Sequence, residues 1–183
     1  LALGGCDPRL IPSDTPTPAD TVVLPDSFPQ ATDSVHATFA VVSDVHFLSP
    51  RMIESESSPT LRDYQAGDRK MIIEGPSILH SWLDSMRSLR PDFVLITGDL
   101  TLDGEKASHE DLADSLGTLV DLGIKVVVLP GNHDVGTSPG AFTATGAVPT
   151  DGVSAADFAR IYARSGYGQT LSRDSTSLSY VTE

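Results

Sequence analysis

Ile124-Lys125-Val126-Val127-Val128-Leu129-Pro130-Gly131-Asn132-His133-Asp134 joins a run of mostly apolar, β-forming residues to a tip of polar and turn-forming residues. Two earlier apolar runs end in the same way: residues 37–43 precede Asp44 and His46, and residues 93–97 precede Gly98 and Asp99. The carboxyl ends of parallel strands are where α/β proteins place their chemistry. The three strand tips therefore predict one shared site.

Two amphipathic helices are expected between these strands. Residues 77–89 and 105–122 carry apolar side chains at three- and four-residue spacing. The resulting order β-α-β-α-β predicts an α/β fold with a parallel sheet. The nearly continuous apolar character of residues 37–43 predicts a central strand that is covered on both faces. A further helix over 154–164 and a strand over 176–182 complete the expected elements.

The segment over 47–75 is polar and is expected to form one uninterrupted loop. It contains Pro50, Pro59 and a run of serines, which are typical of turns and loops. Loops of this length are uncommon in compact domains and are often functional. The sequence leaves open whether this loop faces a substrate or is only a solvated excursion.

Composition limits the classes of function. The chain has 183 residues, enough for one domain with a sizeable core. Its formal net charge is −13, which argues against a nucleic-acid partner because non-specific binding to nucleic acid needs a basic face. We interpret the acidity mainly as a contribution to solubility, while carboxylates gathered at one site would also attract divalent cations.

The first 36 residues differ from the rest and are expected to form a separate segment. Leu1-Ala2-Leu3-Gly4-Gly5-Cys6 resembles a bacterial lipobox, in which the cysteine is lipidated, and the proline-rich stretch after it is typical of an extended tether. An ordinary free cysteine is the alternative. The resemblance predicts an exported protein of the bacterial cell envelope, held on the membrane by a lipid at Cys6. No run approaches the ~18 apolar residues of a membrane-spanning helix.

The polar residues at the strand tips are typical ligands of transition metals. Carboxylate and amide oxygens together with imidazole nitrogen suit Mn²⁺, Fe, Zn²⁺ or Ni²⁺ better than Ca²⁺. Asp44 and His46 are two positions apart, so an extended backbone would point both side chains the same way. Asp99 has two oxygens with which to bridge two ions, and Asn132 offers a neutral oxygen. His133 is suited to donate a proton to a leaving oxygen, and two ions would activate water against a phosphate ester.

Asp44-Val45-His46, Gly98-Asp99 and Gly131-Asn132-His133-Asp134 resemble the first three motif blocks of the calcineurin-like metallophosphoesterases, in the same order and each after a strand. The resemblance implies a domain over 37–183 with the family's four-layer α/β/β/α sandwich and a binuclear metal site. It also implies a role for each residue: Asp44 and His46 bind the first ion, Asp99 bridges the two, Asn132 binds the second, and His133 is the catalytic acid, oriented by Asp134.

The pattern departs from the family after Asp134. The family completes its metal sites with later histidines, whereas the histidines of this chain lie at positions 36, 46, 80, 109 and 133. We expect His80 and His109 to be surface or solvated side chains, and we assign no role to His36. The simplest interpretation is that the chain is the N-terminal half of a longer protein.

Two functions follow from this pattern. The first is metal-dependent hydrolysis of a phosphodiester or a phosphomonoester, with a small molecule or a lipid head group as substrate. The second is a catalytically incomplete module that binds a metal or a phosphate without turnover. A nucleotide-binding α/β domain is disfavoured because the chain has neither a Gly-x-Gly-x-x-Gly motif nor a Gly-Lys-Ser/Thr phosphate loop.

Overall fold

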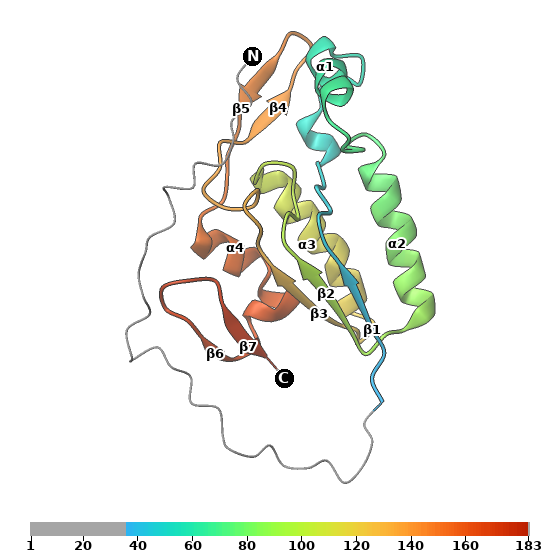
Figure 1. Ribbon diagram of the computed structural model, residues 1–183, viewed down its shortest axis with the longest axis vertical. Coiled ribbons are helices and arrows are strands. Elements are labelled where there is room, and N and C mark those ends of the chain that lie inside the picture. The colour runs from blue at the N-terminus through green and yellow to red at the C-terminus, as the bar shows by residue number, and fades with distance from the viewer. Residues whose placement is uncertain (1–35, 183) are drawn as a thin grey trace. The chain divides into compact units, whose positions relative to one another are not determined.

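The computed structural model describes residues 36–182, and their fold is built on a three-stranded parallel sheet in the order β1-β2-β3 (Figure 1). Strands β1 (Phe39–Val42), β2 (Phe93–Thr97) and β3 (Lys125–Leu129) correspond to the three apolar runs. Val41 pairs with Leu95, which in turn pairs with Val127, so the three carboxyl ends reach the same edge of the sheet. The predicted α/β class and parallel sheet are confirmed.

Two helices cover one face of this sheet. Helix α2 (Gly75–Leu89) lies beside β1 in Figure 1, and helix α3 (Lys106–Val120) lies behind the sheet and connects β2 to β3. The helices contribute leucine and methionine side chains to the core, namely Leu79, Leu83, Met86, Leu112, Leu116 and Leu119. These pack with alternate residues of the strands, namely Val94, Ile96, Val126 and Val128. Burial of this shared face fixes how the strand tips stand relative to the helices.

Among the sheets formed by residues 36–182, β1 is an edge strand with one exposed face, which corrects the prediction that it is central and covered on both faces. Phe39 and Val41 are each 57% exposed, while Ala40 and Val42 pack against the core. Because nearly every residue of the strand is apolar, the sequence does not reveal that only one face is covered. Phe39 has one aromatic partner on that open face, Phe93, stacked at a ring-centroid distance of 4.9 Å.

The expected loop over 47–75 contains two short helices, so the prediction of an uninterrupted loop was wrong. η3 (Pro50–Met52) and α1 (Pro59–Gly67) each have a proline in the first turn, where its missing N–H is not needed. A small second core anchors this segment and is made of Leu48, Leu61, Ile72, Leu102 and Phe142. Helix α1 buries only Leu61 and therefore shows no apolar stripe in the sequence.

Small elements follow β3. The hairpin of β4 (Gly140–Phe142) and β5 (Ala147–Pro149) was not predicted. Helix α4 (Ala155–Ile161) begins after Ser154, as expected, with a capping box between Ser154 and Asp157, and a kinked turn, η4 (Ala163–Tyr167), follows it. The strand expected over 176–182 is reduced to β7 (Tyr180–Thr182), which pairs with β6 (Thr170–Arg173) in a second hairpin.

The sheets formed by residues 36–182 are the three-stranded sheet and the two hairpins, so the four-layer sandwich stays a prediction. None of the helices in this part of the chain combines the length and the apolar character that a bilayer span requires. The lipobox and tether predicted around Cys6 lie outside the described residues.

Candidate metal centre

Three side chains from the tips of β1 and β2 form a compact group. Ligand atoms of Asp44, His46 and Asp99 all lie within 4.8 Å of one another. Backbone hydrogen bonds continue the pairing of the two strands beyond their ends. The Asp44 N–H donates to the Gly98 carbonyl at 3.2 Å, and the His46 N–H donates to the Asp99 carbonyl at 2.9 Å. The sheet edge thus brings together two carboxylates and an imidazole, a donor set suited to a divalent cation. Asp44, His46 and Asp99 form this metal group.

The three residues share an uncommon backbone conformation. Their φ angles are +54° at Asp44, +44° at His46 and +46° at Asp99, in the left-handed region. Asp44 and His46 do converge, but the expected reason was wrong, because the chain does not stay extended past β1. The left-handed backbone conformation costs of order 1–3 kcal/mol for a residue other than glycine. It persists where the surrounding structure enforces it, often at functional sites. The fold, rather than local preference, therefore holds this geometry.

His46 has the electrostatic properties of a metal ligand. Burial of the ring is the main cause that lowers its pKa, the positive charge of Lys70 acts in the same direction, and Asp99 acts in the opposite one. A lowered pKa favours the neutral imidazole, which is the form that binds metal. Within the described residues its Nδ1 is buried without a hydrogen-bond partner. A buried, unpartnered ring nitrogen beside two carboxylates fits a divalent cation.

The loop over 130–134, at the tip of β3, approaches Asp99 closely. A Cβ on Gly131 would overlap the carboxylate and the backbone nitrogen of Asp99, so this position requires glycine. The His133 N–H donates to Asp99 Oδ1 at 3.1 Å, and the His133 ring meets the His46 ring edge-on at a centroid distance of 5.1 Å. Asn132 is exposed. The structure therefore brings His133 to the metal group and leaves Asn132 open to solvent.

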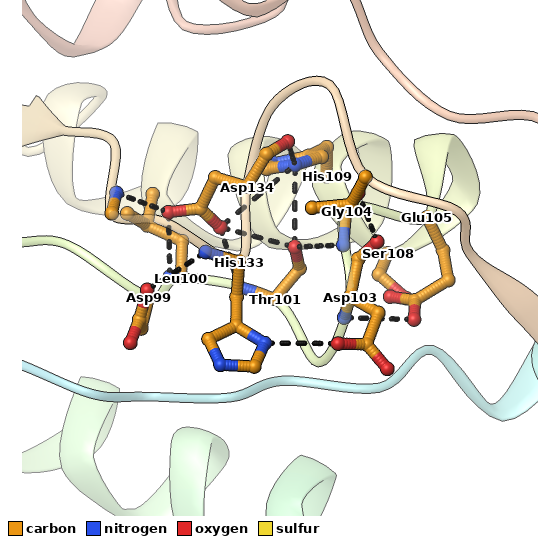
Figure 2. A network of polar contacts seen from close by, with 12 residues as sticks. Asp99, Leu100, Thr101, Asp103, Gly104, Glu105, Ser108, His109, His133 and Asp134 are labelled. Carbon is orange, nitrogen blue, oxygen red and sulfur yellow. Dashed lines mark hydrogen bonds and ion pairs between the residues drawn. The ribbon is translucent and has the colours of Figure 1, made fainter. Parts of the chain in front are cut away.

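Asp103 holds the His133 ring, a role that sequence reasoning missed. Its Oδ1 lies 2.9 Å from His133 Nδ1, as Figure 2 shows. A second carboxylate four residues after Asp99, at the same strand tip, is the only sequence signal for this contact. Because Nδ1 faces Asp103, Nε2 is the ring nitrogen that remains to face a substrate.

Asp134 joins two loops, which corrects the prediction that it orients His133. The residue is fully buried, and its carboxylate accepts hydrogen bonds from the N–H groups of Leu100 at 3.1 Å, Thr101 at 2.9 Å and Gly131 at 2.7 Å. The Thr101 hydroxyl donates a fourth at 3.1 Å. The carboxylate therefore ties the loop after β2 to the loop after β3 (Figure 2).

His109 is fully buried, so the expectation of a solvated side chain was wrong. Its Nε2 lies 3.0 Å from the Asp134 carbonyl oxygen, and its Nδ1 lies 3.0 Å from the Tyr162 hydroxyl. Burial lowers its pKa, and the charge of Asp134 opposes this shift. The spacing of three and seven residues to Leu112 and Leu116 is the signal that His109 faces inward on α3. It supports the loop of Asp134 and lies outside the metal group.

Glu105 is a second buried acid behind the site. The residue is 1% exposed, and its Oε1 accepts a hydrogen bond from the Asp103 N–H at 2.9 Å. Its Oε2 has no partner among the residues that the structure describes. Burial raises the pKa of this carboxyl to about 7. Glu105 thus steadies the backbone of the residue that holds His133.

Comparison with known proteins identifies the family to which these strand-tip residues belong. No curated protein matches the chain. The family profile described as calcineurin-like phosphoesterase matches residues 37–174. The matched stretch is most of the chain and contains the three strand tips, so the resemblance expected from the motif blocks is confirmed. The chain that carries this metal group is a member of the calcineurin-like phosphoesterase family.

Proposed function

We propose that this chain hydrolyses phosphate esters with bound divalent metal and with water as the nucleophile. Membership of the calcineurin-like phosphoesterase family points to metal-dependent phosphoester hydrolysis as the reaction class. The observation that carries the proposal is the group of Asp44, His46 and Asp99, with the His133 ring against it. A cation site with a proton donor beside it is what transfer of a phosphoryl group to water needs.

The donor set defines which residues would hold the metal. Asp44, His46 and Asp99 would bind one cation, and we extend this to a binuclear site in which Asp99 also serves a second ion together with Asn132. The proposed metals are Mn, Fe, Zn or Ni, because the donors are oxygens and imidazole nitrogen. A bound divalent cation polarises the phosphoryl group and makes water a better nucleophile at neutral pH.

His133 is the acid of the proposed reaction. Asp103 takes up Nδ1 and so holds the ring in one orientation, with Nε2 free for the substrate. In this orientation the imidazole would give its proton to the leaving oxygen as the ester bond breaks. The edge-on contact with His46 supports this role because it puts the donor beside the metal group.

The substrate class and the cellular location are further parts of the proposal. We propose a phosphodiester or phosphomonoester of a small molecule or lipid head group, and the net charge of −13 disfavours nucleic acid. We also propose a lipid anchor at Cys6 in the bacterial cell envelope, supported by the lipobox-like sequence that ends there. Cys6→Ser should release the protein from membranes, and continued membrane association would contradict the anchor.

The experiment that tests the proposed function measures metal content and turnover in one preparation. The chain is saturated with Mn²⁺, freed of excess metal, analysed for elements, and assayed with p-nitrophenyl phosphate and bis(p-nitrophenyl) phosphate. Asp99→Asn should abolish hydrolysis and sharply weaken metal binding. Asp63→Asn is the matched control, because Asp63 is an exposed aspartate on α1, and it should change neither quantity.

The outcomes distinguish a binuclear metal site, a site for one metal ion and a catalytically incomplete module. About two ions per chain would support the binuclear arrangement, and one would restrict the centre to the group of Asp44, His46 and Asp99. Metal binding without any turnover would favour the catalytically incomplete module. Unchanged turnover in Asp99→Asn would remove Asp99 from the site.

A further inference from the structure

A cavity of about 470 Å³ opens beside the metal group. Asp44 and His46 line it, together with residues of helix α2. Its volume lies in the range of about 300–1,000 Å³ that is typical of small-molecule sites. The cavity is therefore large enough for part of a ligand and is continuous with the proposed metal centre.

The walls of this cavity are mostly apolar. The apolar lining includes Val45, Met71, Ile78, Leu79, Trp82 and Ile96. Met71 is 58% exposed and Ile78 is 50% exposed, although packing in the core would favour burial of both. An open apolar surface next to a charged centre is typical of a site that receives the apolar part of a ligand.

Two cationic residues, Arg69 and Lys70, line the same cavity. Lys70 lines the cavity together with His46 and pairs with Asp68 at 3.8 Å. In a chain with a net charge of −13, cations beside the metal group favour an anion at this place. The cavity thus offers positive charge near His46 and apolar surface along α2.

We propose that the cavity binds the alkyl chain of an amphiphilic phosphate ester, whose phosphate lies between Lys70 and the metal group. This inference rests on the proposed function, because the metal centre sets the position of the phosphate. Apolar walls that are mostly aliphatic, with Trp82 as the aromatic member, favour an alkyl chain through burial of apolar surface. The same walls offer few partners for the hydroxyls of a sugar or the polar edge of a base, which would be costly to bury unpaired.

Trp82 makes occupation of the cavity measurable, because it is the only tryptophan of the chain and lines the cavity. Its fluorescence is titrated with n-alkylphosphonic acids from ethyl to octyl, with Zn²⁺ present and below micelle-forming concentrations. The carbon–phosphorus bond of these probes is not an ester bond, so binding is measured independently of turnover. Each added methylene should tighten binding about fourfold, which corresponds to about 0.8 kcal/mol per buried CH₂.

Variants at exposed positions test the cavity without disturbing the core. Met71→Gln combined with Ile78→Gln should reduce the gain per methylene to below about twofold. Leu89→Gln is the matched control, because Leu89 lies on the same helix as Ile78, is 68% exposed and is not part of the cavity lining. It should leave the series unchanged. Lys70→Gln should weaken binding of every phosphonate by a similar factor.

The possible results distinguish this proposal from the proposed function. A dissociation constant that does not depend on chain length, or equal slopes in the double variant and the wild type, would overturn the cavity proposal. Tighter binding of phenylphosphonate than of hexylphosphonate would overturn the choice of an alkyl occupant. If the phosphonate series behaves as expected while no phosphate ester is hydrolysed, only the proposed function fails. If p-nitrophenyl phosphate is hydrolysed while the series shows no length dependence, only the cavity proposal fails.

Discussion

Asp134→Asn tests how the fold assembles the metal centre. In the native protein, Oδ1 of the buried carboxylate accepts hydrogen bonds from the N–H and the hydroxyl of Thr101, and Oδ2 accepts from the N–H groups of Leu100 and Gly131. An asparagine in the same rotamer keeps one acceptor oxygen and turns its NH₂ group toward the donors of the other. The substitution therefore removes the charge and breaks two of the four hydrogen bonds.

The expected loss follows from these contacts. A hydrogen bond to a charged group contributes about 1.5–3 kcal/mol, so the loss of two should lower the free energy of unfolding by about 3 kcal/mol or more. In a chain of this size, 1 kcal/mol shifts Tm by about 2–4 °C, so 3 kcal/mol corresponds to a decrease of roughly 6–12 °C. Metal affinity should also fall, because fewer hydrogen bonds hold together the two loops that carry Asp99 and His133.

Thermal unfolding followed by circular dichroism, with and without Mn²⁺, measures both effects. If the native state binds metal as proposed, Mn²⁺ should raise the wild-type Tm, and this increment should shrink in Asp134→Asn. Asp121→Asn is the control: it removes the exposed partner of Arg164 and should lower Tm by about 2 °C or less. A Tm for Asp134→Asn within that same margin, with the full metal increment, would show that the carboxylate does not hold the loops together.

Three further predictions concern the groups around the site. The native Glu105 carboxyl has a pKa of about 7, against 4.5 for an ordinary glutamate. Between these two pH values the native state binds more protons than the unfolded state, so the free energy of unfolding falls as the pH rises. This decrease in the free energy of unfolding is on the order of 3 kcal/mol by pH 8. Glu105→Gln should abolish the decrease, so that its Tm, measured by circular dichroism, is higher than that of the wild type at pH 8 and equal to it at pH 5. His133→Ala should lower kcat by roughly 10²–10⁴-fold and Asp103→Asn by less, both with unchanged metal content by elemental analysis, and loss of metal from either variant would reassign that residue as a ligand. Gly131→Ala should abolish metal binding because its Cβ overlaps Asp99, whereas Gly146→Ala, at a position with open space, should bind metal normally; equal metal content in the two variants would contradict the close approach.

The sheet was predictable because its strands carry their own signal. Residues 93–97 form β2 as expected, and β3 begins one residue after the expected start. Polar residues at the carboxyl ends of parallel strands must meet at one edge, so the grouping of Asp44, His46 and Asp99 was also within reach of the sequence. The sequence could not show that one face of β1 is exposed, because this depends on which other elements pack against the strand.

The finer contacts of the site join segments that are far apart in the chain. Asp103 lies 30 residues from His133, and no local pattern connects the two. Two partners of the His109 ring, Tyr162 and Asp134, are 53 and 25 residues away, and a third, the Thr101 hydroxyl, is eight residues away. Charged and polar neighbours in the sequence suggest a solvated His109, whereas its spacing to Leu112 and Leu116 on α3 indicates an inward-facing one, and its tertiary partners show how the buried ring is held.

The left-handed backbone at Asp44, His46 and Asp99 has an evolutionary consequence. Aspartate and histidine tolerate this conformation better than most side chains, but glycine relieves it completely. Glycine would relieve the backbone at these positions but remove the side chains that form the group, so their presence despite the strained backbone fits the proposed metal binding. A lineage that lost the proposed activity would be free to change these three positions, glycine included, while packing preserved its core leucines. The residues at 44, 46 and 99 in a related sequence thus indicate whether that sequence keeps the proposed metal site.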